Sequence, residues 1–219
     1  MTAIKLCGLS TEASVQAALD VDAEMIGLNF FEPSPRYVSP QSAAKLAQII
    51  RRQTAHTTEI IALTVNMDDE GHSRIVDVLK PDWIQLHGKE TPDRVAQIKK
   101  KFDLPVMKAF GISTREDLAQ LDDYKHVVDR FLFDAKPPKD SVLPGGNGAA
   151  FDWHLMENLE LGKPIVLSGG LDKDNVAEAI HITRPAAVDV SSGIESGKGI
   201  KDLDKIRAFA AAVRNADAG

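Results

Sequence analysis

The stretch Ile4-Lys5-Leu6-Cys7-Gly8-Leu9-Ser10-Thr11-Glu12 sets the pattern of the whole chain. A short apolar run ends at a thiol, the chain breaks at a glycine, and Ser10-Thr11-Glu12 is typical of a helix start. If residues 4–7 form a strand, Cys7 stands at its carboxyl end, where parallel α/β folds place their chemistry. The stretch therefore predicts a strand, a loop that starts with a thiol, and a helix.

The same unit recurs outward along the chain. Its apolar runs are continuous, which is typical of parallel strands covered on both faces. We expect strands at residues 4–7, 25–29, 59–65, 83–86, 106–109, 131–133, 164–167 and 187–190. The helices between them are expected at residues 12–19, 40–52, 68–79, 92–100, 114–121, 152–158, 174–181 and 202–212. Eight units close a (β/α)8 barrel, so residues 1–219 are expected to form an α/β fold, a single-domain TIM barrel. A doubly wound open sheet is the alternative.

Composition limits the possible partners. The chain is 43% hydrophobic and 26% charged, with a net charge of −6, which argues against nucleic acid as a ligand but leaves an anionic small molecule open. A single cysteine cannot form an internal disulfide, so a reducing compartment is expected. We find no signal-peptide pattern and no apolar run near the ~20 residues that span a membrane. A cytoplasmic protein with no membrane contact is the prediction.

The predicted strand ends carry polar, titratable and glycine residues. In a barrel these ends and the loops that follow them form the active site. The residues are Cys7, Asn29, Asn66, His87, Phe110, Asp134, Ser168-Gly169-Gly170 and Ser191-Ser192-Gly193. A purely structural barrel has no need of such a set, so we expect the functional site here.

Two glycine-containing loops follow the seventh and eighth predicted strands. Gly169 and Gly170 lie in the first loop, and Ser192 and Gly193 in the second. Many barrels bind a phosphate between these loops, because glycine lets backbone N–H groups approach the oxygens. Either loop alone is explained as well by a tight turn. The two together favour a phosphate-bearing ligand.

Asp134 is a candidate general acid. It ends the apolar run Phe131-Leu132-Phe133, where partial desolvation would raise its pKa. A capped loop or an ion pair with Lys136 is the alternative.

Cys7 is either a small buried hydrophobe or a base whose pKa a nearby cation lowers. Lys5 lies on the same side of the predicted strand and can supply that cation. Pairing of Lys5 with a carboxylate such as Asp189 is the structural alternative.

Arg36 and His87 are further candidates. Arg36 lies in Pro33-Ser34-Pro35-Arg36-Tyr37, where two prolines stiffen the loop and can hold the guanidinium ready for a carboxylate. A solvated surface arginine is the alternative. His87 is a polar strand-end group or a satisfied core histidine.

Other chemistries have little support. The histidines show no metal-ligand spacing, Gly146-x-Gly148 is not a dinucleotide fingerprint, and Ser168 and Ser192 lack the context of a nucleophile elbow. We therefore expect no metal.

Seven motifs read together resemble one family. They are Lys5-Leu6-Cys7-Gly8, Pro33-Ser34-Pro35-Arg36-Tyr37, Gln85-Leu86-His87-Gly88, Phe133-Asp134, Gly145-Gly146-Asn147-Gly148 before Phe151-Asp152-Trp153, Leu167-Ser168-Gly169-Gly170-Leu171, and Val188-Asp189-Val190-Ser191-Ser192-Gly193-Ile194-Glu195. In order and spacing they resemble the phosphoribosylanthranilate isomerases of tryptophan biosynthesis, from residue 4 to about residue 209. Asn147 departs from the threonine usual there, which puts detail of the substrate loop in doubt but not the reaction.

The resemblance implies a cofactor-free barrel that rearranges N-(5'-phosphoribosyl)anthranilate, an aminoaldose, to an aminoketose. It assigns the general acid to Asp134, the general base to Cys7 and the contact with the anthranilate carboxylate to Arg36. His87 and Asp189 are expected among the substrate-binding groups. The phosphate is expected at Gly169, Gly170, Ser192 and Gly193. Members of the family occur as monomers and homodimers, and both states stay open here.

Rival functions remain. A related indole-glycerol-phosphate synthase would use lysine and glutamate at strand ends, and a dual histidine/tryptophan isomerase would carry an aspartate where Cys7 stands. A non-catalytic barrel that binds a phosphorylated ligand is the rival from another class. It predicts that Cys7 and Asp134 can be changed with no effect beyond stability.

Overall fold

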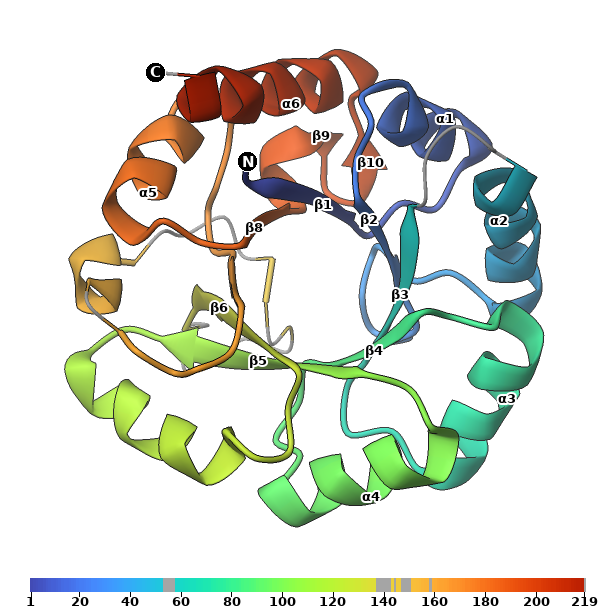
Figure 1. Ribbon diagram of the computed structural model, residues 1–219. Helices are drawn as coiled ribbons and strands as arrows, with labels where there is room; N and C mark the ends of the chain where they lie inside the picture. The colour runs from blue at the N-terminus through green and yellow to red at the C-terminus, as the bar shows by residue number, and fades with distance from the viewer. Residues whose placement is uncertain (53–57, 137–142, 144, 147–150, 158, 219) are drawn as a thin grey trace.

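The computed structural model describes residues 1–52, 58–136, 143, 145–146, 151–157 and 159–218. Eight parallel strands of this part of the chain form a closed barrel in sequence order, and β1 pairs with both β2 and β8 (Figure 1). The strands are β1 Ala3–Cys7, β2 Met25–Asn29, β3 Glu59–Thr64, β4 Trp83–Leu86, β5 Val106–Ile112, β6 Arg130–Ala135, β7 Ile165–Leu167 and β8 Ala187–Val190. The predicted TIM barrel is confirmed, and the open sheet is excluded.

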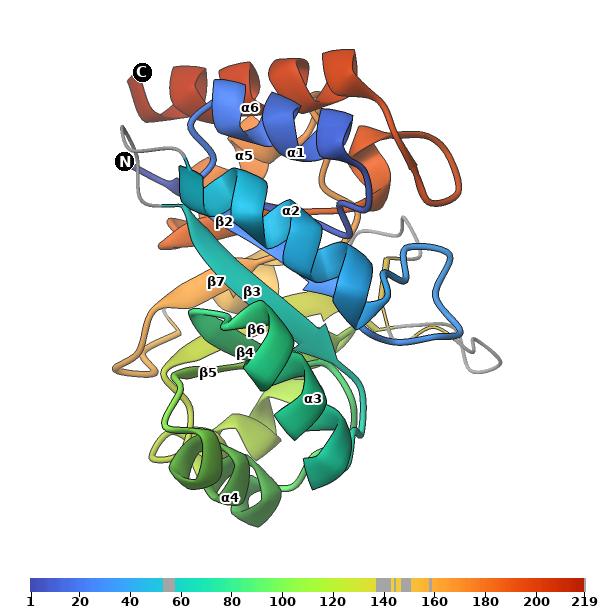
Figure 2. The same cartoon turned by 90° about the vertical axis from the view of Figure 1, so that its right-hand side faces the viewer.

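The helices form a ring outside the barrel. They are α1 Glu12–Asp20, α2 Pro40–Arg52, α3 Asp69–Leu79, α4 Pro92–Phe102, α5 Val176–Thr183 and α6 Leu203–Ala218. The helices α1 to α4 lie side by side in this order, and α6 packs against both α5 and α1 (Figure 2). Local sequence fixes the helix starts, since the side chains of Thr11 and Thr91 accept hydrogen bonds from the backbone N–H groups three residues on.

Two helices expected from the sequence are 3-10 helices instead. Residues 114–121 were expected to be helical, and the structure has η1 Arg115–Tyr124; residues 152–158 correspond to η2 Trp153–Met156, with residue 158 outside the described residues. In η1 the N–H of Asp117 donates to the carbonyl of Thr114, and the Asp117 carboxylate accepts from the N–H groups of Ser113 and Thr114. The first turn is therefore closed at the tighter i,i+3 spacing.

The apolar core is divided into three clusters. A small cluster fills the barrel interior near its amino end: Met25, Ile61, Met107, Ala109, Leu132, Val166 and Ala187. The first outer cluster packs β1 to β3, β7 and β8 against helices that include α1, α2, α5 and α6. The second outer cluster packs β4 to β6 against α4, η1 and η2. Phe151, which is half-buried, packs against both outer clusters.

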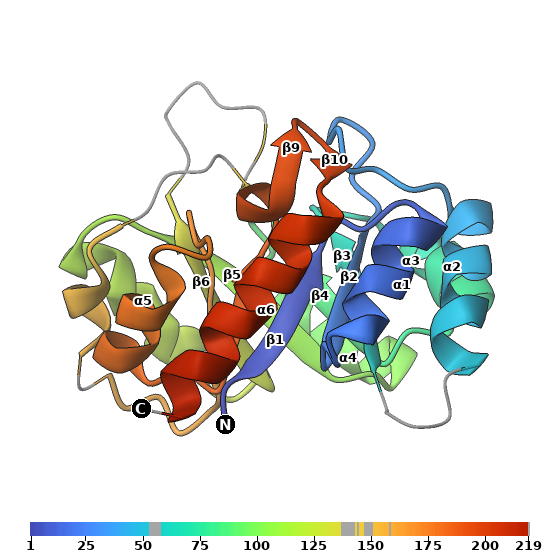
Figure 3. The same ribbon diagram turned by 90° about the horizontal axis from the view of Figure 1, so that it is seen from above.

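The carboxyl ends of the strands carry an addition that sequence reasoning did not predict. The short helix η3 Ser192–Ile194 leads into a hairpin of β9 Glu195–Gly197 and β10 Ile200–Lys201. Figure 3 shows this hairpin at one end of the barrel and both chain ends at the other. Among the described residues, no helix has the length and apolar character needed to cross a bilayer.

Candidate active site

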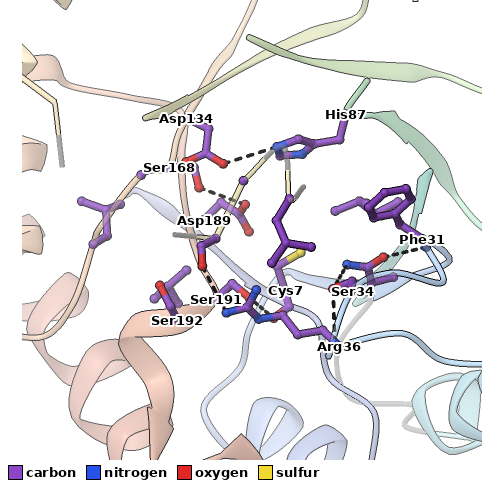
Figure 4. Close-up of a pocket in the computed structure, with 18 of the residues that line it drawn as sticks. Cys7, Phe31, Ser34, Arg36, His87, Asp134, Ser168, Asp189, Ser191 and Ser192 are labelled. Atoms are coloured by element: carbon purple, nitrogen blue, oxygen red, sulfur yellow. Dashed lines mark hydrogen bonds and ion pairs between the residues drawn. The ribbon is translucent and has the colours of Figure 1, made fainter. Parts of the chain in front are cut away.

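A cavity opens at the carboxyl ends of the strands, where TIM barrels place their active sites. All the predicted site residues except Gly193 line it: Cys7, Arg36, His87, Asp134, Gly169, Gly170, Asp189 and Ser192 (Figure 4). These residues come from six different strands and the loops that follow them, so the barrel brings together groups that are far apart in the sequence.

Cys7 lies at the end of β1, with 5% of its surface exposed. The missing side chain of Gly27 on β2 makes room for it, because a Cβ there would lie 2.8 Å from Sγ. Burial raises the pKa of the Cys7 thiol, although the charge of Lys5 acts against this. The cation expected from the sequence is present, but desolvation outweighs it.

Lys5 and Asp189 form an ion pair inside the barrel, with 2.8 Å between Nζ and Oδ1. Ser168 Oγ lies 3.3 Å from the other carboxylate oxygen of Asp189 and donates to it. The two alternatives posed for Lys5 are therefore both realised: the lysine pairs with Asp189 and also lies beside the thiol, since a Cβ on Gly27 would be close to both groups.

Asp134 stands on β6 and is bonded on both oxygens. Its Oδ1 accepts from the N–H of Ala135 at 2.8 Å, and its Oδ2 lies 3.3 Å from His87 Nε2. The alternative partner, Lys136, pairs with Asp117 instead. Gly145 comes so close that a Cβ on it would collide with the Asp134 carboxylate, so the backbone at Gly145 packs directly onto the candidate acid.

His87 is held between two polar side chains. Its Nε2 faces Asp134, and its Nδ1 lies 2.9 Å from the amide nitrogen of Gln85. Gln85 is fully buried on β4 and was missed by sequence reasoning. Its position two residues before His87 in a strand, hence on the same face, is the signal that could have found it.

Arg36 is buried and does not lie on the open surface, so the surface alternative is wrong. Its Nε and Nη2 donate to Glu195 at 2.6 and 3.0 Å, and Nη2 also donates to the carbonyl of Gly146. Lys201 donates to the same carboxylate at 2.8 Å. Although burial alone would raise the pKa of Glu195, these two cations lower it to about 2.

The two glycine loops meet at one side of the cavity. Gly169 has a φ of +88°, and a Cβ on it would lie 2.5 Å from the backbone nitrogen of Ala135. Gly193 follows Ser192 and is not itself a lining residue, and a Cβ on it would collide with the carbonyl of Leu171. Asn147 and Gly148 of the third glycine loop lie outside the described residues, as does most of the loop from residue 136 to residue 148.

The closed barrel and a polar cavity at its carboxyl mouth define a TIM-barrel enzyme. The family model described as N-(5'phosphoribosyl)anthranilate (PRA) isomerase matches residues 4–212. The chain therefore belongs to the N-(5'-phosphoribosyl)anthranilate isomerase family.

Individual relatives agree with the family model. The chain is 53% identical to the N-(5'-phosphoribosyl)anthranilate isomerase of Rhodopseudomonas palustris strain BisA53, over 96% of this chain and 95% of that protein. It superposes on the crystal structure of phosphoribosyl anthranilate isomerase from Thermotoga maritima with a TM-score of 0.86 and 30% identity, over the full length of both chains. A further solved isomerase, in complex with reduced 1-(o-carboxyphenylamino)-1-deoxyribulose 5-phosphate, matches with a TM-score of 0.81 and 28% identity, over 98% of this chain and 100% of that chain.

Proposed function

We propose that this protein converts N-(5'-phosphoribosyl)anthranilate to 1-(2-carboxyphenylamino)-1-deoxyribulose 5-phosphate in tryptophan biosynthesis, with Asp134 as acid and Cys7 as base. The observation that carries the assignment of roles is the placement of one carboxyl and one thiol on β6 and β1, facing one cavity. An aldose–ketose isomerisation needs one acid and one base, and an imine of the substrate can take up the electrons in place of a cofactor.

The first step is ring opening. Asp134, in its protonated form, gives its proton to the ribose ring oxygen, the bond from that oxygen to C1' breaks, and the anthranilate nitrogen forms an imine with C1'. The N–H proton leaves as the imine forms, and the Asp134 carboxylate can take it up. His87 Nε2 and the N–H of Ala135 hold the carboxyl group in place for this exchange.

The second step is proton abstraction. The Cys7 thiolate removes the proton from C2', and the electron pair of that C–H bond forms the C1'–C2' double bond. The π pair of the imine moves to the nitrogen, which is protonated to give the enolamine. The C2' hydroxyl then loses its proton while C1' gains one, which completes the aminoketose. Only proton transfers and shifts of bonds within the substrate are needed, so the proposed reaction requires no metal or redox group.

Arg36 is proposed to bind the anthranilate carboxylate. A guanidinium has five N–H donors, and three of them are used by Glu195 and Gly146. Among the described residues, no hydrogen bond uses the two N–H groups of Nη1, so these two donors remain for a ligand. Glu195 therefore fixes the orientation of Arg36 without using all of its donors.

The phosphate is proposed to lie against Gly169, Gly170, Ser192 and Gly193, with backbone N–H groups as donors. Asp189 and His87 are proposed to contact the sugar hydroxyls, since both side chains line the same cavity as the acid and the base. We also propose a cytoplasmic protein that is a monomer or a homodimer; the solved relatives include monomers generated from the dimeric isomerase of Thermotoga maritima.

The test is a stopped-flow assay with the purified protein and N-(5'-phosphoribosyl)anthranilate. Turnover should decrease the anthranilate fluorescence of the substrate, at a rate proportional to the enzyme concentration. Binding without consumption of this signal would contradict the isomerase assignment and favour the non-catalytic phosphate-binding barrel. Analytical ultracentrifugation of the same sample decides between monomer and homodimer.

A further inference from the structure

Lys5 is a fully buried lysine with no place in the proton transfers described above. It precedes Cys7 by two residues on β1, so both side chains point to the barrel interior. Its register partner on β8 is Asp189, and the two side chains form the ion pair of 2.8 Å. The ammonium group also lies beside the Cys7 thiol, because a Cβ on Gly27 would be in contact with both Sγ and Nζ.

The barrel leaves room for this approach of ammonium and thiol. Gly27 on β2 is the register partner of Cys7, and a Cβ on it would lie 2.8 Å from Sγ and 3.2 Å from Lys5 Nζ. Any larger side chain at this position would push the two groups apart. The local sequences of β1, β2 and β8 thus agree in bringing thiol, ammonium and carboxylate together.

We propose that Lys5, oriented by Asp189, is a positioning residue that stabilises the thiolate form of Cys7. The proposal rests on the assignment of Cys7 as the base and adds the group that makes the base available. Moving a charge from water into a protein interior costs free energy. The buried ammonium of Lys5 and its single carboxylate partner already form a neutral pair. An ammonium that also lies beside a thiol can stabilise a second negative charge when the thiol ionises.

Each charged group near the thiol should either raise or lower the pKa of Cys7. Burial raises the pKa of Cys7, Lys5 on β1 opposes this, Asp189 on β8 adds to it, and Lys201 on β10 opposes it. β2 contributes only glycine at this point, and His87 and Asp134 line the same cavity. Removal of the ammonium should therefore make the thiolate harder to form, and removal of the carboxylate should make it easier.

The test uses the fact that Cys7 is the sole cysteine of the chain. The rate of alkylation by iodoacetamide is measured as a function of pH. The midpoint of this rate–pH curve reports the ionisation of the thiol, and the plateau at high pH reports the access of the reagent to it. Cys7→Ser is the blank. We expect Lys5→Met to raise the midpoint by about one pH unit or more. At a fixed pH below the midpoint, alkylation of this variant should be about tenfold slower than that of the wild type. Asp189→Asn should lower the midpoint.

A purely structural ion pair predicts a different result. Loss of either partner would then admit water and move both midpoints in the same direction, downward toward the value of a free thiol. Midpoints that shift in opposite directions support the proposal, and a midpoint that is unchanged or lower in Lys5→Met overturns it. If Lys5→Met does not fold, Lys5→Gln is measured in its place and judged by the same shift.

Lys108→Met is the matched control. Lys108 is a second buried lysine with a carboxylate partner, Glu90 at 3.3 Å, but it lies on β5 near the ring of Phe110. Its loss should reduce stability while leaving the Cys7 midpoint at the wild-type value. Alkylation needs no turnover, so a failure of the isomerase assignment and a failure of this proposal give separate results.

Discussion

Arg36 and Glu195 are 159 positions apart in the sequence, yet they form a two-bond ion pair at the mouth of the barrel, with distances of 2.6 and 3.0 Å. Only 5% of either side chain is exposed. The pair joins the loop after β2 to β9 and fixes the plane of the guanidinium before any ligand arrives. A donor held in this way loses little conformational freedom on binding.

Glu195→Gln should weaken substrate binding more than it slows the reaction. The amide keeps the shape but removes the charge that orients Arg36, so we expect KM to rise about tenfold with a smaller change in kcat. Glu178→Gln, on the exposed face of α5, is the control and should behave as wild type. An unchanged KM would show that Arg36 needs no orientation by Glu195.

Arg36→Ala tests the carboxylate contact itself. We expect KM to rise by about two orders of magnitude, because a charged hydrogen-bonding group facing the substrate is lost. For a substrate analogue that lacks the anthranilate carboxylate, the variant and the wild type should have the same affinity. Equal KM values for wild type and variant would remove the proposed role of Arg36.

Cys7→Ala and Asp134→Asn should each lower kcat by about three orders of magnitude or more, since each lacks one proton-transfer group. Substrate binding, followed by fluorescence, and the circular dichroism spectrum should stay close to wild type. Turnover that survives in either variant would exclude that residue as the acid or the base.

Gly169→Ala should impair phosphate binding and reduce stability. The position has a φ of +88°, and a Cβ on it would lie 2.5 Å from the backbone nitrogen of Ala135, so the loop must shift. We expect inorganic phosphate to inhibit this variant about tenfold more weakly than wild type. Gly162→Ala is the matched control: its φ is +65° and nothing lies within 4 Å of the added atom, so it should lose stability only.

His72 should make the fold less stable in mild acid. Its side chain is buried between Thr64 and the carbonyl of Asp68, and burial lowers its pKa below the ordinary value of 6.5. The unfolded chain therefore binds a proton more readily, so stability is full above pH 6.5 and is lost as pH falls below it toward the folded pKa. Urea unfolding at about pH 8 and about pH 5.5 should show this loss, and His72→Gln should lose less stability over the same interval.

The barrel could be predicted because its strands are local features. The apolar runs at residues 25–29, 83–86 and 187–190 stop at polar or glycine residues, and the structure has the same bounds for β2, β4 and β8. β5 runs on to Ile112, beyond the expected end at residue 109, because Phe110, Gly111 and Ile112 pair with Phe133, Asp134 and Ala135. Pairing partners of this kind are not visible in a local pattern.

The candidate site was predictable as a set of strand ends but not as a network of contacts. The sequence places Arg36, His87 and Asp134 at the same end of the barrel, and nothing in it states that Glu195 meets Arg36 or that Gln85 meets His87. The hairpin of β9 and β10 was missed because its strands are only three and two residues long. Its signal was the turn Gly197-Lys198-Gly199, in which Gly199 has a φ of +81°.

The division of the outer core has a consequence for the motions of the enzyme. The second outer cluster covers β4 to β6 with α4 and two 3-10 helices, whose hydrogen bonds are weaker than those of α-helices. Amide hydrogens in this half should exchange faster than those under α1, α2, α5 and α6, because local opening costs less there. Asp134 belongs to the half that we expect to open more readily, and Cys7 belongs to the other half. We therefore expect local opening to change the distance between the proposed acid and the proposed base.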